Sequence, residues 1–159
     1  MPKHPISPIY NENSKILILG SFPSVKSREE EFFYGHRQNR FWKVLAYVFG
    51  SGEPDDAEEK KEFLLTHSIA VWDVIASCDI TGSADSSIKN VVANDISTIL
   101  NNCDIREIYV NGKTAEKLYN KYIKRAVNRE AIYLPSTSPA NARYSLEDLV
   151  AEWQTITTK

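Results

Sequence analysis

An unbroken aliphatic run limits what this 159-residue chain can fold into. Residues 15–19 read KILIL and are closed by Gly20. Because the run has no polar alternation, it predicts a strand buried on both faces, as in a parallel sheet covered by helices. Gly20 and Pro23 allow the chain to turn sharply where it leaves the sheet.

Three further apolar runs alternate with helical patterns. The other expected strands are residues 68–75, 106–110 and 131–134, and the expected helices are residues 39–49, 55–66, 94–101, 114–126 and a last one capped by Ser145. Residues 76–89 have the composition of a small-residue loop, and Asn111 with Gly112 indicates a strand-ending turn. This alternation predicts an α/β fold, a three-layer α/β/α sandwich with a central four-stranded, mostly parallel sheet.

The composition excludes several classes of protein. With 19 basic and 21 acidic residues, the net charge of −2 excludes a bulk polycationic nucleic-acid binder but leaves room for a local basic face. No apolar run is long enough to cross a membrane, and the first ten residues lack the apolar core of a signal peptide. The two cysteines fit a reducing compartment. We therefore expect a cytoplasmic protein whose residues 1–159 form a single domain.

The unusual stretches of the chain follow the expected strands. These are residues 21–39, 73–89, 111–114 and 135–143. In α/β folds, ligands bind beyond the carboxyl ends of the strands. The topology and the composition therefore predict one ligand site, formed where these four segments meet. The histidines lack metal-ligand spacing, so we expect neither a metal nor a cofactor in it.

Aromatic residues crowd the first of these segments and the start of the helix after it: Phe22, Phe32, Phe33, Tyr34, Phe41 and Trp42. They either fold back into the core or line a pocket for a flat ligand. His36, Gln38 and Asn39 stand beside them. Rings that can stack, next to polar groups that can hold a water or an amide, are typical of a base-binding pocket.

Three motifs carry a resemblance to a known family. They are GSFPS at residues 20–24, YGHRQNRFW at residues 34–42 and LPSTSPAN at residues 134–141. The chain resembles the uracil-DNA glycosylase superfamily, and within it the hypoxanthine-DNA (deoxyinosine) glycosylase branch. The resemblance covers nearly the whole chain, because the order of elements also agrees.

The resemblance implies a monofunctional DNA glycosylase of base excision repair. Such an enzyme flips a deaminated base, with hypoxanthine preferred and uracil secondary, out of the duplex and hydrolyses its N-glycosidic bond to leave an abasic site. Asn39 would hold the attacking water or the base, and Tyr34 would stack on the flipped base. The loop at residues 135–141 would press into the DNA. The implied partner is DNA containing a deaminated base, bound by a monomer.

The candidate site residues fall into three groups. Asn39 and His36 are the catalytic candidates, although Asn39 can instead cap the helix that follows it and His36 can make a structural hydrogen bond. The base-binding candidates are Ser21, Phe22, Tyr34 and Asp73, the last of which can also cap a loop. The DNA-binding candidates are Ser136, Thr137, Ser138, Asn141 and Arg143, whose hydroxyls, amide and guanidinium can donate to phosphate.

One position departs from the wider superfamily, in which many members carry a catalytic Asp or Asn two residues after the glycine. Here that position is Phe22, which cannot orient water. Either Asn39 takes over, or activity on uracil is weak. The same departure supports a second hypothesis, a module that binds nucleic acid or a nucleotide without cleaving it. A hydrolase using Ser21 or Ser136 is a third hypothesis, and the missing Gly-x-Ser-x-Gly elbow counts against it.

Overall fold

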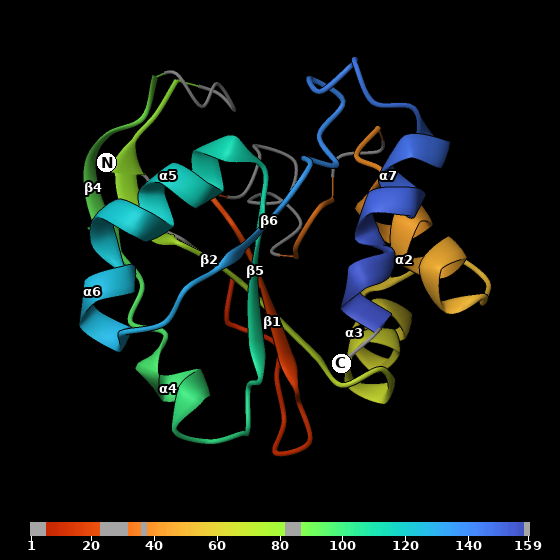
Figure 1. Ribbon diagram of the computed structural model, residues 1–159, viewed down its shortest axis with the longest axis horizontal. Coiled ribbons are helices and arrows are strands. Elements are labelled where there is room, and N and C mark those ends of the chain that lie inside the picture. Colours follow the sequence, from red (N-terminus) through yellow and green to blue (C-terminus); the bar gives the residue numbers. More distant parts are fainter. Residues whose placement is uncertain (1–5, 23–31, 36–37, 82–86, 158–159) are drawn as a thin grey trace.

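A four-stranded parallel sheet forms the centre of the computed structural model, which describes residues 6–22, 32–35, 38–81 and 87–157 (Figure 1). The strand order is β2–β1–β5–β6, and every neighbouring pair is parallel. The strands are β1 (Ile16–Gly20), β2 (Ile69–Asp73), β5 (Glu107–Asn111) and β6 (Ile132–Leu134). The expected class, an α/β/α sandwich around a four-stranded sheet, is confirmed.

Both faces of the sheet are buried, as the aliphatic run predicts. Ile16 and Ile18 of β1 join the core on one face, which is covered by α2 (Phe41–Phe49), α3 (Ala57–Thr66) and α7 (Leu146–Trp153). Leu17 and Leu19 join the core on the other face, beneath α4 (Ser97–Leu100), α5 (Lys113–Tyr122) and α6 (Lys124–Val127). Successive side chains of a strand point to opposite faces, so one strand supplies both cores.

Local signals set the ends of two helices. Gly50 ends α2 in the left-handed conformation, at φ 65°, where its N–H bonds the last turn. At the start of α7, the Ser145 hydroxyl accepts from the Asp148 N–H and the Asp148 carboxylate accepts from the Ser145 N–H. This reciprocal capping box satisfies donors that a helix start leaves open. Both ends agree with the expectation.

The loop expected at residues 76–89 is wrong at its two ends, where the structure has strands. The second strand ends at Asp73, and the chain continues as an antiparallel hairpin of β3 (Ile75–Asp79) and β4 (Lys89–Ala93). The side chain of Asn94 donates to the carbonyls of Asp73 and Ile75, at 2.9 and 3.2 Å, and so fastens the hairpin to the end of β2.

Two expected helices also differ in length. The helix expected at residues 114–126 is divided into α5 and α6 at Ile123, whose φ of −116° departs from helical geometry and whose side chain is buried in the core. The helix expected at residues 94–101 shortens to α4. A short η2 turn (Gln154–Thr157) follows α7.

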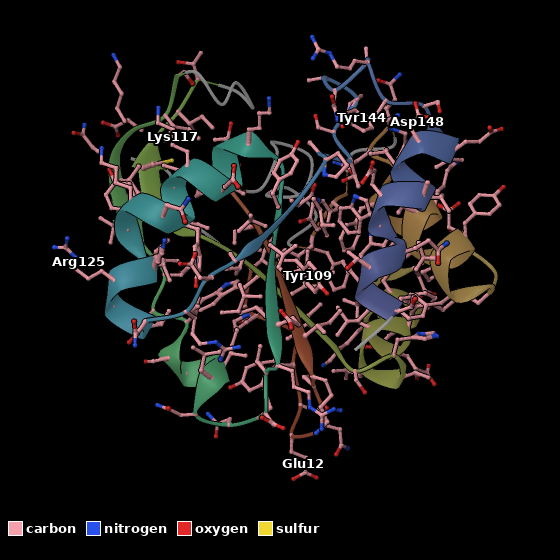
Figure 2. The ribbon with its side chains drawn as sticks, viewed as in Figure 1. Glu12, Tyr109, Lys117, Arg125, Tyr144 and Asp148 are labelled. Atoms are coloured by element: carbon pink, nitrogen blue, oxygen red, sulfur yellow. The ribbon has the colours of Figure 1, made fainter. Side chains whose placement is uncertain are left out.

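The parallel arrangement places all four strand ends at one edge of the sheet, here called the carboxyl edge. Strand β1 lies between β2 and β5, so the chain leaves β1 toward β2 on one side and later returns to β5 on the other. Such a switch point opens a crevice at the carboxyl edge. Figure 2 shows Tyr144 at this end of the molecule and Glu12 at the opposite end.

In the described part of the chain, no helix combines the length and apolar character needed to cross a bilayer.

Candidate active site

Asn39 lies just before α2 and uses its side-chain oxygen twice. Oδ1 accepts a hydrogen bond from the Phe41 N–H at 3.0 Å and another from the Thr137 hydroxyl at 2.8 Å. A backbone N–H can only donate, so the atom facing it must be the amide oxygen and not the nitrogen. The amide nitrogen of Asn39 makes no hydrogen bond to any described residue, and the side chain is partly exposed.

Asn111, the last residue of β5, holds Thr137 from the other side. Its Oδ1 accepts from the Thr137 N–H and its Nδ2 donates to the Thr137 hydroxyl oxygen, both at 3.1 Å. Thr137 is fully buried, and its hydroxyl proton is directed to Asn39. Its carbonyl also accepts from the Arg40 N–H at 3.0 Å. Three segments, β5, the loop after β6 and the start of α2, therefore meet at one threonine.

Arg40 binds the loop after β6 from within. Its guanidinium donates to the carbonyls of Ser138 and Asn141, each at 3.1 Å, and to that of Tyr144. The indole N–H of Trp153 donates to the carbonyl of Pro135 at 3.0 Å. Because donors of the core hold these carbonyls, the loop is kept in one shape.

Tyr34 stacks on Phe41, with ring centroids 3.9 Å apart and planes at 14°. Its φ of 53° is uncommon for a residue other than glycine and is held by this packing. Its hydroxyl oxygen is buried and makes no hydrogen bond within the described residues. Burial, followed by the charge of Asp73, raises the pKa of the Tyr34 phenol above its ordinary value, while the nearby Asn111 amide lowers it. The phenol is therefore a neutral group.

Gly20 leaves room for Asp73 and Tyr34 at the end of β1. It pairs with Asp73 in the sheet, and a Cβ at Gly20 would meet the Asp73 carboxylate and come within 3.0 Å of the Tyr34 hydroxyl. Asp73 itself is only 3% exposed. A side chain at position 20 would thus displace a buried carboxylate and a buried phenol.

Comparison with known proteins places this arrangement in a family. Residues 7–156 match the model of the Uracil DNA glycosylase superfamily. The chain belongs to the uracil DNA glycosylase superfamily. A protein of Methanosarcina acetivorans named hypoxanthine DNA glycosylase is 35% identical over 158 residues, 98% of each chain. A protein of the same name from Methanosarcina barkeri is 32% identical over 155 residues, 96% of each chain.

A solved structure agrees with the family. A solution NMR structure from Methanosarcina acetivorans, described as a candidate uracil DNA glycosylase, superposes with a TM-score of 0.79 at 31% identity and covers 96% of both chains. The family resemblance inferred from the three sequence motifs is therefore confirmed.

Most of the aromatic residues in and just before the second motif serve as core in this member of the uracil DNA glycosylase superfamily. Phe33, Phe41 and Trp42 are buried, and Phe41 packs edge-on against Trp42 and Trp153. Tyr34 remains partly exposed beside them. Phe22 packs, also partly exposed, against the core on the other face of the sheet. Of the two alternatives, core or pocket, the core interpretation holds for the three buried rings.

The loop after β6 separates its candidate DNA contacts into two kinds. Ser136 and Ser138 accept from backbone N–H groups at 3.1 and 3.2 Å, so each hydroxyl keeps a proton to donate, and Arg143 is exposed. Thr137 is different: its burial and its two hydroxyl partners leave nothing for phosphate, which corrects the expectation of a DNA contact there. The side-chain amide of Asn141 donates to the Ser136 carbonyl at 3.0 Å.

The remaining predicted site residues lie at the same edge or outside the described chain. Ser21 follows β1, is partly exposed, and accepts at its carbonyl from the Ile75 N–H at 3.0 Å. His36 lies outside the described residues. Among the described residues, no group of three or more His, Cys, Asp or Glu side chains is close enough to hold a metal ion.

Asn111 is the site residue that sequence reasoning missed. The Asn-Gly pair indicated a strand-ending turn, and the strand does end there. Its side chain nevertheless organises Thr137 across 26 positions of sequence. The signal that identifies it in the sequence is its place at the carboxyl end of a strand beside the switch point, because side chains there line the crevice in which ligands bind.

Gly20→Ala is expected to destabilise the protein by about 1–3 kcal/mol, because the new methyl group forces the buried Asp73 carboxylate and Tyr34 hydroxyl apart. Urea unfolding measures the change. Gly52→Ala is the matched control, since a Cβ there has nothing within 4 Å, and we expect it to stay within about 0.5 kcal/mol of the parent. Equal losses in the two variants would contradict the close packing at Gly20.

Arg40→Gln is expected to loosen the loop at residues 138–144 and to cost about 2–3 kcal/mol, since three partly buried carbonyls lose a charged donor. Amide hydrogen exchange should accelerate at Asn141 and Tyr144, whose N–H groups bond within the loop. Arg106→Gln removes an exposed guanidinium whose ionic partner among the described residues is Asp104, and it serves as control. Unchanged hydrogen exchange in Arg40→Gln would show that the shape of the loop does not depend on the Arg40 guanidinium.

Proposed function

We propose that this protein is a monofunctional DNA glycosylase that releases deaminated bases, with hypoxanthine preferred and uracil secondary. The observation that carries the proposal is the amide of Asn39, held at the carboxyl edge of a uracil DNA glycosylase fold with its nitrogen left to donate. The named relatives, matched over nearly their whole length, support the hypoxanthine preference.

Hydrolysis of an N-glycosidic bond builds positive charge on the sugar and negative charge on the departing base. Donors held in advance at the position of the base stabilise that charge without reorganising. Asn39 is such a donor. Because both lone pairs of its oxygen are occupied, its part is to bind the base and not to accept a proton from water.

Asp73 supplies an acceptor at the same edge. Hypoxanthine and uracil both present a ring N–H next to a carbonyl, and a carboxylate accepts from the N–H while an amide N–H donates to the carbonyl. We assign Asp73 to the ring N–H and Asn39 to the carbonyl. Tyr34, with one ring face on Phe41, offers its other face to the flipped base.

The loop after β6 is proposed to contact the DNA backbone. Ser136 and Ser138 keep hydroxyl protons for phosphate, and Arg143 supplies an exposed guanidinium. Thr137 and Asn141 hold the loop from inside and act on the DNA only through its shape. We further propose that the protein acts as a single-domain monomer in the cytoplasm.

Asn39→Ala is expected to slow the release of hypoxanthine from a deoxyinosine duplex by about 10²–10³-fold, the usual cost of losing one donor to the developing charge. Base release is measured by alkaline cleavage of the abasic product under single-turnover conditions, and DNA affinity by fluorescence anisotropy. Affinity should change only a few fold. Asn120→Ala, on the exposed side of α5, is the control and should keep the parent rate.

The second candidate, a binding module without catalysis, is supported by Phe22 at the position where many superfamily members carry a catalytic Asp or Asn. It predicts firm binding of the deoxyinosine duplex with no base released over many hours by the unaltered protein. Full activity in Asn39→Ala would instead support the enzyme hypothesis and show that the reaction does not use Asn39.

A further inference from the structure

The polarity of the Asn39 amide is set by a chain of hydrogen bonds that begins and ends on the backbone. The Thr137 N–H donates to Asn111 Oδ1, which leaves Asn111 Nδ2 as the donor to the Thr137 hydroxyl. The single hydroxyl proton must then point to Asn39 Oδ1, which also receives the Phe41 N–H. Each group has one role available to it.

Reversal of this chain is costly at both of its ends. If Asn39 turned its amide over, its NH₂ group would face the Phe41 N–H and the Thr137 hydroxyl proton. If Asn111 turned over, its NH₂ group would face the Thr137 N–H. Thr137 is fully buried, so water cannot relieve such a donor–donor contact. The orientation is therefore built into the folded protein before any DNA arrives.

We propose that Asn111 and Thr137 are positioning residues that fix Asn39 as a hydrogen-bond donor toward the base. The enzyme thereby selects bases that carry a carbonyl oxygen at that position. The inference rests on the proposed function and adds to it the cause of selectivity. Deamination replaces an exocyclic amino group, a donor, with a carbonyl oxygen, an acceptor. A locked N–H donor matches the deaminated base and opposes the amino group of adenine or cytosine.

The decisive experiment compares two substrates, one of which lacks the carbonyl oxygen. A duplex carries either deoxyinosine or 2′-deoxynebularine, whose purine lacks the 6-oxygen and the hydrogen on N1. The missing N1 hydrogen affects parent and variant alike, so the ratio of their rates on each substrate reports the contact with the oxygen. Thr137→Val keeps the shape of the side chain but removes the hydroxyl. We expect it to slow single-turnover base release by about 10–100-fold on deoxyinosine and by less than about threefold on deoxynebularine. Thr137→Ser, which restores the hydroxyl, should stay within about threefold of the parent on both.

Controls separate positioning from general damage. Thr98→Val makes the same change at an exposed site on α4, at the opposite end of the sheet, and should leave both rates unchanged (Figure 1). Asn111→Ala removes the other end of the chain and should follow the pattern of Thr137→Val. A variant that merely weakened the fold would slow both substrates alike, and that result would overturn the proposal.

A second measurement does not require turnover. In ¹⁵N-labelled protein, the side-chain amide of Asn39 should be as rigid as the backbone around it, and Thr137→Val should make it mobile. Free rotation of that amide in the unaltered protein would contradict the proposal that Asn111 and Thr137 fix its orientation. If the unaltered protein releases no hypoxanthine, the proposed function fails, while the rigidity of the amide still decides whether the lock exists.

Discussion

A hydroxyl held between two side-chain amides organises the carboxyl edge of this protein. Thr137 receives from Asn111 and donates to Asn39, while backbone N–H groups at either end give the chain of bonds its direction. The three residues come from β5, the loop after β6 and the approach to α2. The contacts that close the fold are therefore also the contacts that orient the amide of the site, and neither can change without the other.

The loop after β6 is also held in place by hydrogen bonds to residues of the core. Arg40 and Trp153 take up its carbonyls, so the loop has a defined shape although it lies at the edge of the sheet. Ser136 and Ser138, both partly exposed, keep hydroxyl protons to donate. A surface arranged before binding loses less conformational entropy when it meets a rigid duplex.

The aromatic cluster supports the site more than it forms it. Phe41 is buried between Trp42 and Trp153 and offers one flat face to Tyr34. That support holds Tyr34 at a positive φ and places its hydroxyl near Asp73. Strained residues persist where their surroundings over-determine them, and such positions gather at functional sites. The core therefore supplies the rigidity that a stacking residue requires.

The sequence alone determined the parallel sheet, the end of α2, the start of α7 and the family, because each was inferred from short runs of neighbouring residues. It did not determine that β3 and β4 pair as a hairpin, that Thr137 is buried, or which way Asn39 faces. Those depend on partners that only folding brings together: Thr137 and Asn39 lie 98 positions apart. A hydrogen bond has direction as well as distance, and the direction is set by the whole arrangement of donors around it.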